Sequence, residues 1–345
     1  MKLLAVCKTF WLRHPVRNLI CLLVLVGLTG SSAYLGWQFD QLDQMPIKGT
    51  GRYITLAKGT SNRQLVSDLA SEPVSPWIAG LWLKWRPELA AIKSGTYRVE
   101  SGWTISHAML LFVSGKEAHF NVTLIEGTRI EDFIRAVREA QFVDQTLDDV
   151  DAATLREALK IEQENIEGLF LPDTYSYTAG TRDIDILRRA YDHMHRFLMR
   201  SWEGRDAGLP YKSPYEVLIM ASIIEKETGK AEERPLIASV FINRLRKGMR
   251  LQTDPTVIYG IRDRYDGNIR KADLQDNNPW NTYVIDGLPP TPIAMPGKAA
   301  IQAALHPSRS NYLYFVAKGG GEHYFSTSLD EHNRAVQRYI LGRKQ

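Results

Sequence analysis

The longest uninterrupted apolar run of the chain lies near its N-terminus. Residues 19 to 37, LICLLVLVGLTGSSAYLGW, contain no charged side chain. As a helix rising ~1.5 Å per residue, this run is just long enough to cross a hydrocarbon layer of ~30 Å. Lys2, Lys8, Arg13 and Arg17 precede it, and Asp40 and Asp43 follow it. The pattern predicts a transmembrane helix.

The flanking charges predict the orientation of this helix. Because Lys and Arg concentrate on the cytoplasmic side, we expect residues 1 to 18 to be a cytoplasmic tail. Residues 38 to 50 then form a polar tether, and the rest lies in the periplasm. A cleaved signal peptide is the alternative. The run is longer than a typical signal core, and Tyr34 with Trp37 resembles an interfacial anchor, so we favour a retained single-pass anchor in the inner membrane.

A strand-like stretch, a glycine turn and a helical pattern follow one another three times beyond the tether. The three segments are ITLAKGTSNRQLVSDLA at 54 to 70, YRVESGWTISHAMLLFV at 97 to 113 and VTLIEGTRIEDFIRAVR at 122 to 138. Their glycines are residues 59, 102 and 127. The pattern predicts a small α/β region. It fits either a weak internal repeat or the ordinary similarity of strand–helix units.

Three tryptophans lie close together in SPWIAGLWLKWRPEL, at positions 77, 82 and 85. Exposed aromatic rings can stack on sugars, but the helical spacing of Trp77, Trp82 and Trp85 among Ile78 and Leu81 favours ordinary packing.

The segment SPYEVLIMASIIEKETG at 213 to 229 predicts a buried helix. Ser213 can cap its first turn, Pro214 suits the first helical position, and Glu216 completes a capping box. The residues from 217 to 224 are apolar nearly all round, as in a core helix. Gly229 is a C-terminal stop.

Two carboxylates, Glu225 and Glu227, end this apolar helix. They belong either to a last turn that emerges into solvent or to a cleft with apolar walls. In such a cleft, desolvation raises the pKa of a carboxyl group and keeps it protonated, as a general acid requires. Both residues continue apolar stripes of the helix, so periodicity does not choose between them.

Further elements follow this helix. A second helix is predicted from 234 to 245, and a third from 255, capped by Thr253 or Asp254. Asp254 is thus either a capping residue or the second carboxylate of a hydrolase. The glycines at 319 to 321 separate two strand-like stretches and predict a hairpin tip.

Composition and charge exclude several classes of function. With 345 residues, of which 44% are hydrophobic, the chain can form about two globular domains. The net charge of +4 is not gathered into runs, and the densest basic stretch, RLRKGMR at 244 to 250, reads as a solvated helix end, so nucleic acid is not an expected partner. Cys7 and Cys21 lie in the tail and the span, which leaves the exported part without disulfides. No cofactor or metal motif is found, and carboxylate chemistry remains.

The segment from 221 to 260 resembles the catalytic core of the endolytic murein transglycosylases, the YceG-like or MltG-type family. The motifs ASIIEKE, VFINRLRKGMRLQTDPTVIYG, NTY at 281 to 283, GLPPTPIAMPG at 287 to 297 and NYLYFV at 311 to 316 occur in the family's order. In that family the first glutamate of EKE is catalytic, which implies Glu225. Gln252, Asp254, Asn281, Tyr283 and Glu227 are candidate substrate-binding residues. Asn281 and Tyr283 are expected in a loop, where polar side chains can meet the N-acetyl group or the hydroxyls of a sugar.

The resemblance also implies the domain organisation and fold class. An α+β chain is expected, with a LysM-like glycan-binding module and linking segment at 51 to 142. A mainly helical, lysozyme-like catalytic domain with small strands follows at 143 to 345. The stretch EGLFLPDTYSY at 167 to 177 is expected to edge its cleft.

The implied reaction is cleavage of peptidoglycan strands between N-acetylmuramic acid and N-acetylglucosamine, leaving 1,6-anhydro ends. An intramolecular hydroxyl replaces water, so the second carboxylate of an ordinary glycosidase is dispensable. A muramidase that uses water with Asp254 or Glu227, and a noncatalytic wall-binding scaffold, are the alternatives. Glycan strands are the expected partner, with wall-synthesis enzymes as further candidates.

Overall fold

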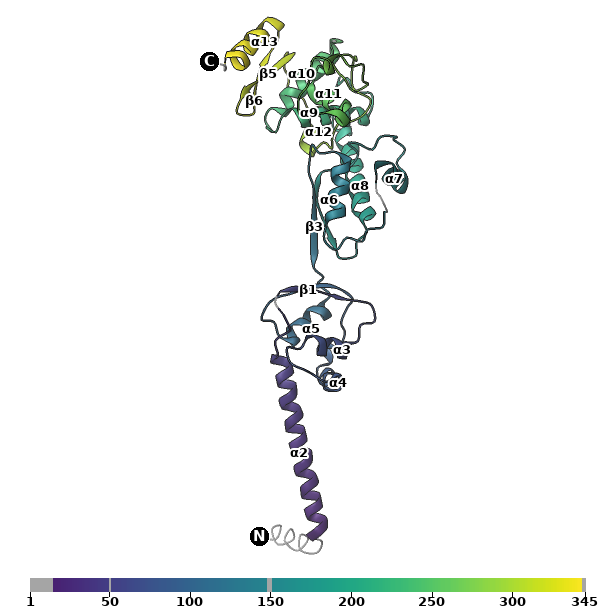
Figure 1. Cartoon of the computed structure of the whole chain (residues 1–345), viewed down its shortest axis with the longest axis vertical. Coiled ribbons are helices and arrows are strands. Elements are labelled where there is room, and N and C mark those ends of the chain that lie inside the picture. Colours follow the sequence, from purple (N-terminus) through teal and green to yellow (C-terminus); the bar gives the residue numbers. More distant parts are fainter. Residues whose placement is uncertain (1–14, 50, 148–150, 343–345) are drawn as a thin grey trace. The chain divides into compact units, whose positions relative to one another are not determined.

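The chain combines helices with small strand pairs, which confirms the predicted α+β class. The computed structural model describes residues 15–49, 51–147 and 151–342 (Figure 1). The predicted tail therefore lies largely outside the described residues. The contacts divide the chain into two compact units, with the boundary between Ala118 and His119. Within the described residues, the named strands form three separate antiparallel pairs, β1–β2, β3–β4 and β5–β6.

The first unit consists of one long helix and a small α/β module. Its elements are α2 (Pro15–Gln44), β1 (Arg52–Leu56), α3 (Asn62–Leu69), α4 (Pro76–Trp85), a short 3-10 turn (Pro87–Leu89), β2 (Gly95–Val99) and α5 (Ile105–Ser114). The core of this module is closed by large buried side chains, among them Trp82, Tyr97 and Phe112.

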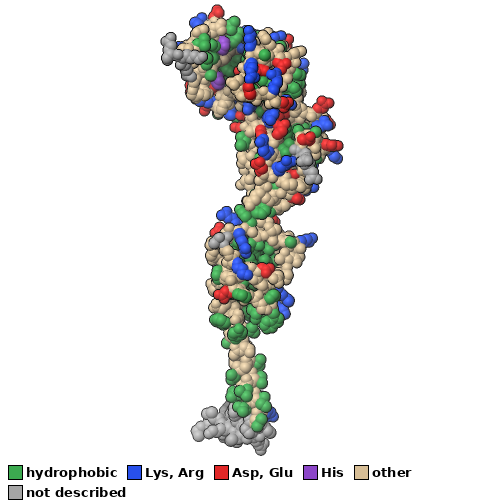
Figure 2. All heavy atoms as spheres, in the orientation of Figure 1, with side chains coloured by type: hydrophobic (Ala, Val, Ile, Leu, Met, Phe, Trp, Pro, Cys, Tyr) green, Lys and Arg blue, Asp and Glu red, His purple; other side chains and the backbone are tan. Residues whose placement is uncertain are grey.

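Among the described residues, α2 is the one helix long and apolar enough to cross a membrane, judged by length and composition. Its side chains between residues 19 and 33 are exposed, and Figure 2 shows them as hydrophobic surface along the helix. An apolar helix without protein packing around it is typical of a segment whose solvent is lipid.

The prediction that residues 38 to 50 form a polar tether is wrong for its first half. Helix α2 continues to Gln44, and Leu42 is buried in the core of the first unit. The Asp43 carboxylate accepts hydrogen bonds from Trp82 Nε1 at 3.2 Å and Ser106 Oγ at 2.6 Å. These contacts compensate the charge of Asp43, and they join the helix end to the module.

The three predicted strand–glycine–helix segments are confirmed as β1–α3, β2–α5 and β3–α6. Gly59, Gly102 and Gly127 all have positive φ angles, of 87°, 82° and 73°, which residues with a side chain rarely adopt. The strands of the three segments do not form one sheet, because β1 pairs with β2 while β3 pairs with β4.

The second unit contains the remaining elements. These are β3 (His119–Leu124), α6 (Ile130–Glu139), α7 (Ala152–Leu159), β4 (Asp173–Thr178), α8 (Asp183–Glu203), α9 (Pro214–Glu227), α10 (Arg234–Arg246), α11 (Asp254–Gly260), 3-10 turns at Arg262–Arg264 and Asp273–Gln275, α12 (Lys298–Leu305), β5 (Tyr314–Gly319), β6 (Glu322–Ser326), α13 (Leu329–Val336) and a π-helical turn (Gln337–Leu341). The boundary predicted near residue 143 falls inside this unit, because β3 pairs with β4 across it.

Helix α9 is the buried centre of the second unit, as its apolar pattern predicts. Ser213 caps it by accepting a hydrogen bond from Glu216 N at 3.4 Å. The Glu216 carboxylate accepts from Lys212 N, one residue before the expected partner. All side chains from Val217 to Ile224 are buried, and α8, α10, α11 and α12 pack around them. The helix therefore delivers the residues of its last turn to a fixed place.

Candidate functional site

The Glu225 side chain lies in the last turn of α9 and is almost fully buried, with 4% of its surface exposed. Its Oε2 accepts a hydrogen bond from the backbone N–H of Gly297 at 2.8 Å. Its Oε1 accepts one from Arg234 Nη2, at the start of α10, at 3.3 Å. Because both carboxylate oxygens have partners, the side chain is held in one orientation. The alternative of a solvent-exposed helix end does not apply to Glu225.

A second carboxylate, Glu126, lies beside this pair. The same Arg234 Nη2 is 3.8 Å from Glu126 Oε1. The Glu126 side chain is half-exposed, whereas only 10% of the Arg234 side chain is exposed. Arg234 Nε is buried and has no hydrogen-bond partner among the described residues. One buried arginine thus lies between a buried and a half-exposed glutamate, and its buried Nε–H has no partner among the described residues.

Backbone hydrogen bonds between two distant segments assemble this cluster. Gly127 N donates to Met295 O at 2.9 Å, and Met295 N donates to Thr128 O at 2.8 Å. The turn after β3, which carries Glu126, is therefore fastened to the loop that ends at Gly297. Ser222, a polar residue within buried α9, accepts from Ile293 N at 3.0 Å and ties that loop to the helix.

Opposing influences act on the proton affinity of Glu225. Burial raises its pKa above the ordinary value, and the nearby negative charge of Glu126 raises it further. The hydrogen bond from Gly297 N and the positive charge of Arg234 act in the other direction, because both favour the carboxylate. The net direction is upward. Such a group holds its proton more tightly than an ordinary carboxyl group and is still stabilised after losing it, as general acid–base catalysis needs.

Glu227 faces a different side of the helix end. It lines a cavity of about 370 Å³ together with Gln252, Asp254 and Tyr283. Thr253 Oγ1 donates a hydrogen bond to Glu227 Oε1. Burial raises the pKa of Glu227 to about 7, and the charge of Asp254 adds to the shift. The structure therefore brings three of the candidate substrate contacts, Gln252, Asp254 and Tyr283, around a fourth, Glu227, whose pKa is raised.

The loop at 281 to 283 is hydrogen-bonded to the residues at the start of α11. Gln252 N donates to Thr282 O at 3.1 Å, and Thr253 N donates to Thr282 Oγ1 at 3.0 Å. The Tyr283 hydroxyl donates to Asp254 Oδ1 at 2.7 Å, and burial raises the pKa of that hydroxyl. Thr253 is the N-cap residue of α11 but makes no side-chain cap. Asp254 thus holds Tyr283 in the cavity wall, while remaining exposed itself.

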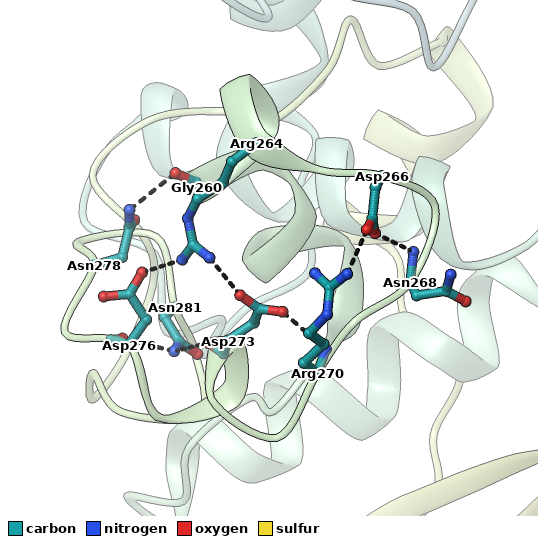
Figure 3. A network of polar contacts seen from close by, with 9 residues as sticks. All are labelled: Gly260, Arg264, Asp266, Asn268, Arg270, Asp273, Asp276, Asn278 and Asn281. Atoms are coloured by element: carbon teal, nitrogen blue, oxygen red, sulfur yellow. Dashed lines mark hydrogen bonds and ion pairs between the residues drawn. The ribbon is translucent and has the colours of Figure 1, made fainter.

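Asn281, predicted as a substrate contact, is 1% exposed and serves the loop instead. Its Nδ2 donates to Asp273 O at 3.1 Å and to Asp276 O at 2.8 Å, and its Oδ1 accepts from Tyr283 N at 3.0 Å. Figure 3 shows it inside a polar network in which Arg264 reaches both Asp273 and Asp276. Asn281 has almost no surface with which to touch a ligand, so the prediction of direct contact is wrong.

Glu126, Arg234 and Gly297 are the site residues that the sequence reasoning missed. The signal for Glu126 is its place directly before Gly127 in the third strand–glycine–helix segment, and Gly297 ends the quoted motif GLPPTPIAMPG. Arg234 was noted only as the start of a helix. None of these positions carries a periodicity that points to Glu225.

Glu167 is a further buried carboxyl group of the second unit. It begins the stretch EGLFLPDTYSY, is 2% exposed, and accepts a hydrogen bond from Ile130 N, at the start of α6, at 3.0 Å. Burial raises its pKa to about 8, and the charge of Glu131 contributes. The observed contact supports the start of α6, the helix that follows the Glu126 turn.

The raised pKa values of Glu167 and Glu227 predict how the stability of the folded chain depends on pH. Because the folded-state pKa values of Glu167 and Glu227 exceed the ordinary value of 4.5, the folded chain holds protons that the unfolded chain releases. The free energy of unfolding should fall as pH rises from about 5, up to about pH 7 for Glu227 and about pH 8 for Glu167, by up to about 1.4 kcal/mol per pH unit for each group. Thermal unfolding of the full chain in detergent at several pH values measures this. Glu167→Gln should flatten the dependence, whereas exposed Glu164→Gln should leave it unchanged; equal slopes would contradict the assignment.

Fold and site together define an α+β protein in which a buried helix ends at two carboxyl groups with raised pKa values. The chain belongs to the YceG-like family, whose model matches residues 54–338. It is 31% identical over 273 residues to an endolytic murein transglycosylase of Bacillus subtilis, covering 74% of this chain and 75% of that protein. An endolytic murein transglycosylase of Streptococcus pneumoniae is 24% identical over 371 residues, covering 95% of this chain and 66% of that protein.

A crystal structure of a YceG-like protein from Listeria monocytogenes is also similar to this chain. The match has a TM-score of 0.48 and 25% sequence identity, and it covers 83% of this chain and all of that one. This level of likeness does not define the fold, which rests on the elements described above.

Proposed function

We propose that this chain is an endolytic lytic transglycosylase that cuts peptidoglycan strands between N-acetylmuramic acid and N-acetylglucosamine. Family membership supports the substrate and the reaction class, because two relatives carry the name endolytic murein transglycosylase. The observation that carries the catalytic assignment is the buried Glu225 carboxyl group, held between the Gly297 N–H and Arg234.

In the first step, protonated Glu225 donates its proton to the glycosidic oxygen as the bond from this oxygen to C1 of the muramic acid breaks. The N-acetylglucosamine side leaves with a new hydroxyl group. Burial and the Glu126 charge favour the protonated form that this step requires.

In the second step, the Glu225 carboxylate accepts the proton of the C6 hydroxyl as O6 of the same muramic acid bonds to C1. A 1,6-anhydro ring forms and Glu225 is protonated again, so no water is consumed. Gly297 N–H and Arg234 stabilise the carboxylate between the two steps, because hydrogen bonds and positive charge favour an anion. No second catalytic carboxylate is needed.

A muramidase that uses water remains the second candidate, favoured by the cavity around Glu227. Glu227 and Asp254 line it together, and one of them would have to activate the water. Mass spectrometry of digested murein separates the two reactions. The proposed function expects anhydro ends; reducing ends would establish the muramidase, and intact strands would favour a noncatalytic scaffold.

We also propose the finer assignments for the two units. Helix α2 is a retained single-pass anchor with its N-terminus in the cytoplasm, so that the enzyme acts in the periplasm near the membrane. The first unit is a LysM-like module and the second a lysozyme-like catalytic domain. Termination of nascent strands, together with wall-synthesis enzymes, is the role that fits such a placement.

The charge of Glu126 should set the pH range of the reaction. In Glu126→Gln a negative charge that raises the pKa of Glu225 is removed, and Arg234 keeps Glu225 as its remaining carboxylate partner. The pKa of Glu225 should then fall, and the loss of activity at high pH should begin at lower pH. The shift should be modest because Glu126 is half-exposed and screened.

Rates of anhydro-end release by the full chain across pH measure this effect. Glu139→Gln, at the exposed end of α6, is the matched control because it makes the same charge change away from the cluster. An unmoved profile, or one displaced to higher pH, would contradict a role of Glu126 at Glu225.

A further inference from the structure

Helix α4 of the first unit exposes an apolar stripe. Trp77 and Trp85 are 64% and 55% exposed, and Leu81 between them is partly exposed. The spacing of four residues places all three along one side of the helix. The opposite side, with Ala79, Trp82 and Leu83, is buried in the core. The prediction of ordinary packing thus holds fully for Trp82, whereas Trp77 and Trp85 each leave more than half of their surface exposed.

This stripe lies beside the end of the predicted span. The Trp85 ring stacks on Phe39 of α2, with ring centroids 5.4 Å apart. Phe39 lies two residues beyond Trp37, where the apolar run ends, which is a rise of ~3 Å. Arg86, next to Trp85, also forms an ion pair with Asp43 of α2. Trp85 is therefore within a few ångströms of the level at which the span leaves the hydrocarbon layer.

The junction between α2 and the module contains no flexible linker that would let the apolar stripe of α4 move away from a bilayer. Helix α2 is continuous to Gln44, and its last turn is fixed by buried Leu42 and by Asp43. Figure 1 shows α4 at the end of the first unit from which α2 extends, and Figure 2 shows hydrophobic side chains gathered at that end.

The chemistry of the exposed groups matches a membrane interface. Tryptophan and tyrosine concentrate where hydrocarbon meets headgroups, because an apolar ring carries a polar N–H or O–H. Exposed Tyr34 and Trp37 on α2 are of this kind, as are Trp77 and Trp85. The one charged residue of α4 is Lys84, a side chain that can reach lipid phosphates while its stem stays apolar.

We propose that α4 is an interfacial helix, whose Trp77, Leu81 and Trp85 insert into the bilayer surface at the C-terminal end of α2. The proposal rests on the proposed retention of α2 as an anchor. Span and interfacial helix together hold the first unit at two places on the membrane. The unit then has one face towards the lipid, and its orientation to the bilayer is set without a partner protein.

Spin labels on the full-length chain in vesicles of phosphatidylethanolamine and phosphatidylglycerol test this. Cys7→Ser and Cys21→Ser remove the native thiols, and single cysteines are then placed by Leu81→Cys, Leu28→Cys or Arg98→Cys. Position 28 reports the span, and exposed Arg98 on β2 is the aqueous control. Collision with oxygen, which dissolves in lipid, is compared with collision with a water-soluble nickel complex.

The label at 81 should show severalfold more collision with oxygen, relative to nickel, than the label at 98. Trp77→Ser combined with Trp85→Ser should reduce this difference severalfold. If the label at 28 collides mainly with oxygen while the label at 81 shows the same oxygen-to-nickel ratio as the label at 98, the interfacial helix is refuted and the anchor stands. A label at 28 exposed to nickel would refute the anchor itself. A label at 81 shielded from both reagents would mean that another protein chain covers α4, which also refutes the proposal.

Discussion

Replacement of Glu225 by glutamine should lower the rate of anhydro-end release by about 10² to 10⁴, the contribution typical of general acid–base catalysis. Glutamine keeps the shape of the side chain and can still accept the hydrogen bond from Gly297 N, but it carries no acidic proton. The folded state should be as stable as the parent or slightly more stable, because the buried carboxyl group is replaced by a neutral amide. Release of muropeptides and thermal unfolding of the full chain measure the two effects.

Glu227→Gln is the matched control, because Glu227 is two residues away, is partly buried, and also has a raised pKa. Its activity should fall much less, since the side chain supports the cavity wall through Thr253. If the variant at 225 retained the parent rate and the variant at 227 lost it, the catalytic assignment would move to Glu227. The water-using mechanism would then gain support.

Replacement of Gly297 by alanine should impair the reaction without unfolding the chain. An added Cβ would clash with Glu126 Oε2 and would lie 3.2 Å from Glu225 Oε2. Glu126 is half-exposed and can swing away, whereas buried Glu225 can only be displaced within its site. A misplacement of about 1 Å at a catalytic group can cost ~10²-fold in rate, so we expect a loss of roughly 10- to 100-fold.

Gly229→Ala is the control for this substitution. Gly229 follows α9 closely, has no heavy atom within 4 Å of an added Cβ, and is not in the left-handed region. It should keep both activity and stability. The observation that would contradict the role of Gly297 is an alanine variant at 297 with parental kcat and an unchanged pH profile.

The local sequence pattern was sufficient to predict those elements whose structure depends on neighbouring residues alone. The apolar run at 19 to 37, the capped helix from 213 and the three glycine turns were all predicted from neighbouring residues. Each rests on a short-range cause: a side chain that caps its own helix, an all-round apolar surface, or a backbone angle that glycine adopts most easily. The third glycine turn proved to carry Glu126, which no local pattern marks as a site residue.

The polar residues were the places where local pattern was insufficient. Asp43 was assigned to a polar tether but accepts hydrogen bonds from Trp82 and Ser106. Asn281 looked like a sugar contact but is saturated within its own loop. A polar side chain is buried or exposed according to whether distant segments supply its hydrogen-bond partners, and those partners are far away in the sequence.

The sequence by itself determined the anchor-like helix, the α+β class, the buried helix α9 and, through its motifs, the family. It left Glu225 and Glu227 equivalent as physical candidates, because both continue apolar stripes of one helix. Only the tertiary structure gave them different surroundings, by placing Gly297 and Arg234 beside Glu225 and Thr253 beside Glu227. The physical reason is that a helix sets the direction of each side chain, whereas the charges and donors around it come from loops more than 20 residues away or from neighbouring helices, and these meet only in the folded chain.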